Sequence, residues 1–96
     1  MVSVVMFIFE KFDVAVRFAK MIKGLPMPSS QLFKFEGEYF MSMDLSGYDE
    51  HELEKMSVIA DEYADDIIAG ADKRAFLMEH AKVILDDKAI ESLAQL

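Results

Sequence analysis

The segment from Ser29 to Leu45 constrains the fold most strongly, because its pattern predicts a β-hairpin. Two runs of aromatic and apolar residues flank Glu36-Gly37, where glycine can adopt the positive φ of a tight turn at little cost. A two-residue turn places Phe33 opposite Phe40, whereas a three-residue loop places it opposite Met41. We favour the two-residue turn. The second strand alternates, with one side carrying Tyr39, Met41, Met43 and Leu45 and the other carrying Phe40, Ser42 and Asp44.

The residues around the hairpin predict further strands and helices. Val2–Phe9 is apolar on both faces, as expected of a central strand. Asp13 is placed to cap the helix that follows it. After the hairpin, Asp49 and Glu52 have the spacing of a capping box. The helix that begins there is expected to bury its regularly spaced apolar residues, which are Leu53, Met56, Ile59, Ala60 and Tyr63.

The last third of the chain predicts two short strands and two helices. The residues from Asp65 to Gly70 favour a small edge strand, and Asp72 is placed to cap a short helix. Lys82–Leu85 is predicted to return as a strand, and Asp86 or Asp87 begins a terminal helix that carries Ile90, Leu93 and Leu96. The order β-α-β-β-α-(β)-α-β-α predicts an α+β domain, with a largely antiparallel sheet and helices packed on one face. Residues 1–96 are expected to form one domain.

Composition argues against several classes of partner. The formal net charge is −8, and the ten basic residues are scattered, so nucleic acid and an anionic membrane surface are disfavoured. The chain has no cysteine, which removes disulfides and thiol catalysis. Val2–Phe9 is too short to span a bilayer and follows no basic segment, so it predicts neither a membrane helix nor a signal peptide.

No pattern in the sequence supports an enzyme, a cofactor site or a metal site. His51 and His80 have no neighbour at metal-ligand or triad spacing. Paired acids such as Asp65-Asp66 lack the D-x-D-x-D-G pattern of a calcium loop and are typical of helix caps and solvated faces. The remaining functional candidates are surface features, namely the acidic bands Asp49–Glu54 and Asp61–Asp66, Glu79 beside His80, and the hairpin aromatics Tyr39 or Phe40.

Six segments together resemble a known family. They are the strand-to-helix junction from Val5 to Asp13, V-A-V-R-F-A-K at Val14–Lys20, L-F-K-F-E-G-E-Y-F at Leu32–Phe40, A-D-E-Y at Ala60–Tyr63, E-H-A-K-V-I at Glu79–Ile84 and D-D-K-A-I at Asp86–Ile90. In this order they resemble the C-terminal domain of the MecA/YpbH adaptor family over essentially the whole chain. Ala64 and Ala81 stand where the family pattern has glycine, a departure that makes the chain look closer to YpbH.

The resemblance implies a cytoplasmic, non-enzymatic adaptor of a Gram-positive bacterium. Such a domain binds the AAA+ unfoldase ClpC, promotes its hexamer assembly and activity with the protease ClpP, and helps to regulate competence through ComK. The resemblance also implies that substrate proteins are bound by an N-terminal domain, which this chain lacks. Weak self-association of the C-terminal domain is a further expectation. Glu62 and Glu79 occupy the acidic positions of two matched motifs and are the expected partner contacts. The alternative function is a small-molecule-sensing regulatory domain of βαββαβ type.

Overall fold

The computed structural model describes residues 3–22 and 24–95. Strands and helices follow one another in the order that the sequence predicted, the short fourth strand included. The elements are β1 (Val4–Phe9), α1 (Phe12–Met21), β2 (Ser29–Phe35), β3 (Glu38–Asp44), α2 (Glu50–Tyr63), β4 (Asp66–Ala69), α3 (Ala71–His80), β5 (Lys82–Leu85) and α4 (Asp87–Ala94). The predicted residues Val2 and Leu96 lie outside the described part of the chain.

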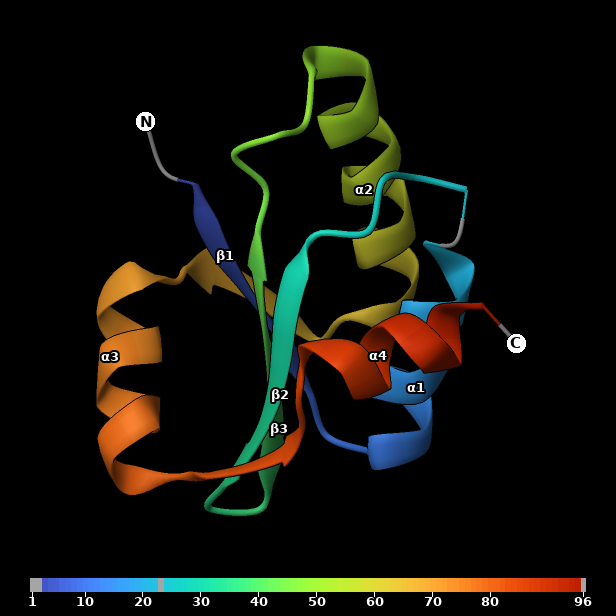
Figure 1. Cartoon of the computed structure of the whole chain (residues 1–96). Helices are drawn as coiled ribbons and strands as arrows, with labels where there is room; N and C mark the ends of the chain where they lie inside the picture. Colours follow the sequence, from blue (N-terminus) through green and yellow to red (C-terminus); the bar gives the residue numbers. More distant parts are fainter. Residues whose placement is uncertain (1–2, 23, 96) are drawn as a thin grey trace.

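The strands form one antiparallel sheet in the order β4-β1-β3-β2-β5 (Figure 1). β1 pairs with β3 on one side and with β4 on the other, which confirms its predicted place in the sheet interior. β4 and β5 are the two edges, and each contains only four residues. The predicted α+β class and the largely antiparallel sheet are therefore confirmed.

The hairpin has the two-residue turn that we favoured. Phe33 lies opposite Phe40 in the β2–β3 register. Glu36 has φ of 50° and Gly37 has φ of 83°, so both central residues are left-handed, as a type I′ turn requires. This turn matches the right-handed twist of the two strands and fixes which side chains of β3 reach each face of the sheet.

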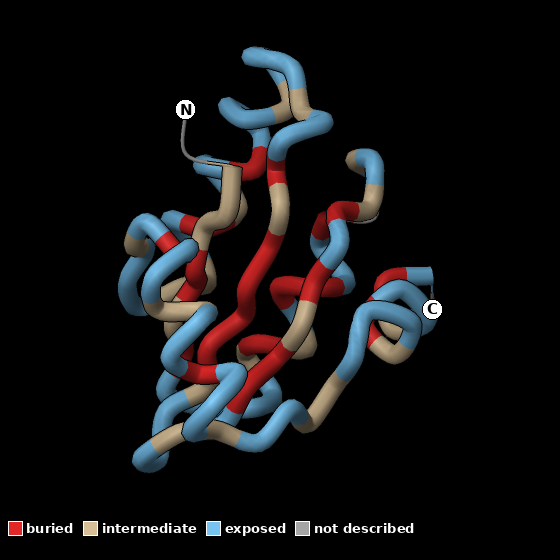
Figure 2. Tube along the Cα trace, turned by 60° about the vertical axis from the view of Figure 1, so that its left-hand side comes forward, coloured by how far each residue is buried: buried red, intermediate tan, exposed pale blue. Residues whose placement is uncertain are grey.

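The larger core lies between one face of the sheet and helices α1, α2 and α4. At its centre the ring of Phe18 lies 4.9 Å from that of Phe7 and 5.4 Å from that of Phe9, centroid to centroid. These three side chains are fully or almost fully buried. Figure 2 shows the buried positions following the strands, while exposed positions follow the outer sides of the helices. Further buried residues of this core are Ala15, Ala19, Ile22, Leu32, Met41, Met43, Met56, Ala60 and Ile90.

A second, smaller core lies on the other face of the sheet, which corrects the prediction that the helices cover one face. Leu77 of α3 packs there with Met6, Phe33 and Phe40. The cause lies in the strands, because β1 and the hairpin place large apolar side chains on both faces. The segment β4-α3-β5 joins the two edges of the sheet, so α3 crosses this second face and covers it (Figure 1).

Of the four helices within the described residues, α2 and α4 begin with the caps that the sequence predicted. The Asp49 carboxylate accepts a hydrogen bond from the Glu52 backbone N–H, and the Glu52 carboxylate accepts one from the Asp49 N–H. This is the reciprocal capping box. Asp86 caps α4 by accepting a hydrogen bond from the N–H of Ala89 at 2.9 Å.

The other two helices begin earlier than predicted. α1 starts at Phe12 with Lys11 as its cap residue, so Asp13 lies in the first turn, where its charge favours the positive helix end. α3 starts at Ala71 after Gly70, so Asp72 also lies in the first turn and is not the cap. Glycine is required at this junction by a close approach, because a Cβ on Gly70 would lie 3.0 Å from backbone atoms of β1.

Packing of α2 differs from the prediction at one position. Met56 and Ala60 are buried, and Ile59 and Tyr63 are partly buried against the larger core. Leu53, however, keeps 44% of its surface exposed. It lies near the start of the helix, before the turns that contain the buried Met56 and Ala60.

Candidate protein-binding site

The two predicted contact residues, Glu62 and Glu79, are both exposed on the surface. Glu62 lies in the last turn of α2 and Glu79 in the last turn of α3. These helices cover opposite faces of the sheet, so the two carboxylates do not form one cluster. The Glu79 carboxylate lies 3.7 Å from Nε2 of its neighbour His80.

Both helices nevertheless finish at the same end of the sheet, which we call the hairpin end because the β2–β3 turn lies there. β4 follows α2 and starts with Asp66 opposite Ile8, near the end of β1. β5 follows α3 and starts with Lys82 opposite Lys34, near the turn. A partner that approaches the hairpin end can therefore meet both predicted carboxylates, one on each side of the sheet.

Several acids of the two predicted bands have structural roles. Asp49 and Glu52 form the capping box of α2. The Asp65 carboxylate accepts a hydrogen bond from the Glu10 N–H at 2.8 Å, and the Asp66 carboxylate accepts one from the Ile67 N–H at 2.8 Å. Other acids of the bands are exposed and are available for a partner, namely Glu50, Glu54, Asp61 and Glu62.

The hairpin aromatics are less exposed than the sequence suggested. Phe40 keeps only 4% of its surface exposed and belongs to the second core, so it is not a surface contact. Tyr39 is half-buried, and its ring packs 5.8 Å from that of Phe12. The prediction of an exposed aromatic on β3 is therefore wrong for Phe40 and holds only in part for Tyr39.

A cluster of aromatic rings surrounds Lys73 in the first turn of α3. The Lys73 ammonium lies 5.2 Å from the ring centroids of Phe40 and Phe76 and 5.9 Å from that of Phe35. The Phe76 ring in turn lies 4.6 Å from that of His80. Cation–π contacts of this kind contribute roughly 0.5–1 kcal/mol each at exposed sites. The Phe76 ring also packs 5.4 Å from that of Phe35 on β2, centroid to centroid, so Lys73 and Phe76 hold α3 against the sheet one to two turns before Glu79.

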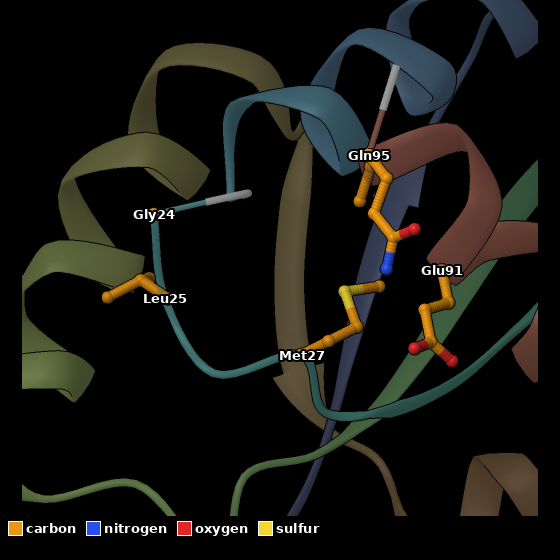
Figure 3. A pocket seen from close by; sticks show the side chains of 6 residues that line it. Gly24, Leu25, Met27, Glu91 and Gln95 are labelled. Carbon is orange, nitrogen blue, oxygen red and sulfur yellow. The ribbon is translucent and has the colours of Figure 1, made fainter.

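A surface groove separates α1 from α2, and we call it the α1–α2 groove. Its volume is about 340 Å³, and it is lined by Met21, Gly24, Leu25, Lys55, Val58 and Ile59. A larger cavity of about 570 Å³ lies on the other side of the loop, against α4. Figure 3 shows Leu25 directed toward α2, while Met27 lies near Gln95 and Glu91 of the α4 side. The loop between α1 and β2 therefore forms a wall of both hollows.

Tyr48 holds this loop in place. Its hydroxyl donates a hydrogen bond of 2.5 Å to the backbone carbonyl of Pro26, across a sequence separation of 22 residues. Burial raises the pKa of the Tyr48 hydroxyl to about 12, and the nearby Glu52 carboxylate raises it further in the same direction. The hydroxyl therefore stays protonated and able to donate at neutral pH.

Neither a metal centre nor a membrane span is found in the described chain. Across residues 3–22 and 24–95, no three histidine or acidic side chains are grouped closely enough to hold a metal ion. Among the described helices, none combines the length and the apolar character needed to cross a bilayer.

The sequence matches the family model described as "Negative regulator of genetic competence (MecA)" over residues 1–93. The chain belongs to the MecA family. The resemblance noted from the motifs is therefore confirmed across nearly the whole chain. No curated protein sequence matches the chain significantly.

Solved structures share the fold of this MecA-family chain. The crystal structure of the C-terminal domain of MecA has 23% identity and a TM-score of 0.76, and covers 96% of this chain and 95% of its own. The C-terminal domain of YpbH has 21% identity and a TM-score of 0.74, with 97% of each chain covered. A chain from "Structural dynamics of the MecA-ClpC complex revealed by cryo-EM" has 22% identity and a TM-score of 0.70, covering 97% of this chain and 94% of its own. MecA and YpbH are thus about equally similar, and these comparisons give no preference to YpbH.

Sequence reasoning missed the α1–α2 groove. One signal was present, because Lys55, Val58, Ile59 and Glu62 have the spacing of a single helix stripe. This stripe is distinct from the one through Met56 and Ala60 that enters the core. The sequence did not show that Met21 and Leu25 lie opposite this second stripe, since that depends on how α1 packs against α2.

Proposed function

We propose that this MecA-family domain is an adaptor module that binds a ClpC-type AAA+ unfoldase. The family match over residues 1–93 carries the proposal. The fold that the chain shares with a component of the MecA–ClpC study supports it. In this role the domain acts through its surface and catalyses no reaction itself.

The proposed action on the unfoldase is a shift of its assembly equilibrium. A ligand that binds the assembled hexamer more tightly than the free subunits favours assembly by its difference in affinity. Several domains bound around one ring act together, so each contact can be individually weak. In this proposal the assembled ring then works with the ClpP protease in the cytoplasm. The resulting proteolysis regulates competence through ComK.

Glu62 and Glu79 are the proposed contacts, and their placement at the hairpin end supports this assignment. Exposed carboxylates at the ends of two helices can pair with arginine or lysine side chains of the partner and set its orientation. Because the two acids lie on opposite faces of the sheet, each is expected to contact a different part of the partner.

Charge reversal tests these contacts. We expect Glu62→Lys and Glu79→Lys each to weaken binding to purified ClpC by about tenfold, which corresponds to about 1.4 kcal/mol, and the double variant to weaken it further. Glu91→Lys is the matched control, because it makes the same charge change at an exposed position of α4. Calorimetry gives the affinity, and stimulation of the ATPase activity of ClpC gives the functional readout. Unchanged binding of both single variants would remove these residues from the proposed interface.

Ionic strength provides a second test of the charged contacts. Exposed charge pairs are screened over about 10 Å at 0.1 M salt, so affinity should fall as salt rises. The double variant should respond less steeply to salt than the unchanged domain, because fewer ion pairs remain to be screened. Equal salt dependence of the two proteins would contradict the proposal.

The alternative function is metabolite sensing, and the cavity beside α4 supports it. Its volume of about 570 Å³ falls within the range of small-molecule sites. Its lining offers the polar side chains of Glu91 and Gln95 for orienting a ligand. A metabolite at about 100 times its dissociation constant would stabilise the fold by about 2.7 kcal/mol, which a thermal-shift screen detects. A clear shift, together with no effect on the ATPase activity of ClpC, would favour this alternative.

A further inference from the structure

The α1–α2 groove gathers apolar side chains that the fold itself does not bury. Val58 keeps 65% of its surface exposed and Met21 keeps 49%, and both line the groove with Leu25. Single exposed apolar residues are common on protein surfaces, but a contiguous group around a hollow marks an interaction site. Val58 is also a β-branched residue on the solvent side of a helix, where its limited rotamer freedom gives it a lower helix propensity than alanine.

The chemistry of the groove fits an apolar anchor better than a metabolite. Of the six residues that line it, Lys55 alone has a polar side chain. Metabolite sites need several converging polar groups to fix the orientation of the ligand. In contrast, the strongest contacts between proteins are often large apolar or aromatic side chains that fill a pocket and displace water.

The charges around the groove indicate which residues of the partner should flank its apolar side chain. Lys55, Val58, Ile59 and Glu62 form one stripe along α2, and Glu62 lies about 6 Å along the helix axis from Val58. Glu54 and Asp61 are exposed on the neighbouring turns of the same helix. Lys55 lines the groove itself, but Glu54, Asp61 and Glu62 lie on the same side of α2, so carboxylates outnumber ammonium groups on this face of the helix. This excess of negative charge complements lysine or arginine.

We infer that the α1–α2 groove receives a large apolar side chain from a basic segment of the ClpC-type partner. This inference rests on the proposed function, because it adds an apolar anchor to the contact proposed for Glu62. The wall of the groove is preformed, since the hydrogen bond from Tyr48 to Pro26 holds the loop that carries Leu25. A preformed pocket loses less conformational freedom on binding than one that must be ordered by the partner.

A substitution at Val58 separates apolar contact from charge. Val58→Asp replaces the apolar surface with a negative charge that would attract a basic partner, so a loss of affinity cannot come from weaker charge attraction. Val58→Ala removes the apolar surface without adding a charge and separates the lost contact from the cost of burying a carboxylate. Valine and aspartate have similar helix propensities, and the site is mostly exposed, so the fold should be retained. Met78→Asp is the matched control, because Met78 is 54% exposed on α3, across the sheet from the groove.

The experiment measures the affinity of each variant for purified ClpC by calorimetry, with circular dichroism to confirm folding. We expect Val58→Asp to weaken binding at least tenfold, Val58→Leu to retain it, and Met78→Asp to change it by less than about twofold. If Val58→Asp fails to fold, Val58→Ser and Val58→Ala provide the same comparison without a charge.

The possible outcomes distinguish this inference from the proposed function. If the unchanged domain does not bind ClpC at any ionic strength, the proposed function fails and the inference fails with it. If the unchanged domain binds and Val58→Asp binds equally well, the groove is not the contact, while the proposed function stands. Loss of binding by Met78→Asp but not by Val58→Asp would place the apolar contact on the α3 face and also overturn the inference.

Discussion

Removing the hydroxyl of Tyr48 should loosen the loop that walls both hollows and should lower stability in a pH-dependent way. In the fold, this hydroxyl donates to the carbonyl of Pro26 and is partly buried beside Glu52. Tyr48→Phe keeps the ring and deletes only the donor. The variant therefore isolates one hydrogen bond between the loop after α1 and the loop before α2.

The pH-dependent part of the expected effect follows from the pKa of the hydroxyl, which burial and the Glu52 carboxylate raise. A rise in pKa from 10.0 to about 12 sets an upper limit of about 2.7 kcal/mol for the preference of the fold for the protonated group. Tyr48 is partly exposed to solvent, which reduces this limit, and we expect about 1 kcal/mol. Separately, loss of the hydrogen bond to Pro26 in Tyr48→Phe should cost about 0.5–1.5 kcal/mol at neutral pH. In a domain of this size a loss of about 1 kcal/mol lowers the melting temperature by about 4–8 °C.

The sign of the pH dependence is fixed by the direction of the shift. Because the folded-state pKa lies above the unfolded value, the stabilisation is fully present below pH 10 and is lost as the pH rises toward 12. About half of it should be lost at pH 11. Phenylalanine does not titrate, so comparison with Tyr48→Phe cancels the effects of the other groups that ionise in this range.

The assay is denaturant unfolding of both proteins at several pH values between 8 and about 11.5, combined with ultraviolet titration of the phenolate groups. The chain has three tyrosines, and the titration should show one that ionises well above the ordinary value and disappears in Tyr48→Phe. Three tyrosines that all titrate near pH 10, or a stability difference that does not change with pH, would refute the reasoning.

Two further predictions concern backbone geometry and capping. Gly70→Ala should destabilise the fold by about 1–3 kcal/mol in thermal unfolding, because the new Cβ would lie 3.0 Å from the backbone of β1. Gly47→Ala is the control, because a Cβ there meets no atom within 4 Å, and it should change stability by less than about 0.5 kcal/mol. Asp49→Ala should cost about 1 kcal/mol by removing the capping box of α2 and should reduce helicity by circular dichroism. Equal melting temperatures of the two glycine variants, or a neutral Asp49→Ala, would contradict these predictions.

Local patterns predicted the elements and several of their junctions. The Glu36-Gly37 turn has its own conformational signature, so the register that pairs Phe33 with Phe40 could be predicted before any tertiary contact was known. The capping box of α2 depends on two residues three positions apart and was predictable for the same reason.

Long-range packing decided the features that the sequence did not predict. α1 starts before Asp13, and its first residue Phe12 packs against Tyr39 of the distant strand β3. α3 lies on the second face because β4 and β5 occupy opposite edges of the sheet, which no local pattern of residues 66–85 reveals.

The candidate site was predictable only in part. The motifs indicated Glu62 and Glu79, and the fold places both at the hairpin end. The α1–α2 groove depends on the juxtaposition of Met21 and Val58 from separate helices, so it becomes visible only in three dimensions.

The strand order gives the domain a directional resistance to pulling. Tension applied from the N-terminal side loads β1, which is hydrogen-bonded to a strand on each flank. Tension applied from the C-terminal side first detaches α4 and then peels β5, an edge strand of four residues that pairs with β2 only. A module stationed beside a machine that translocates polypeptides would therefore unravel more readily from its C-terminal side than from its N-terminal side.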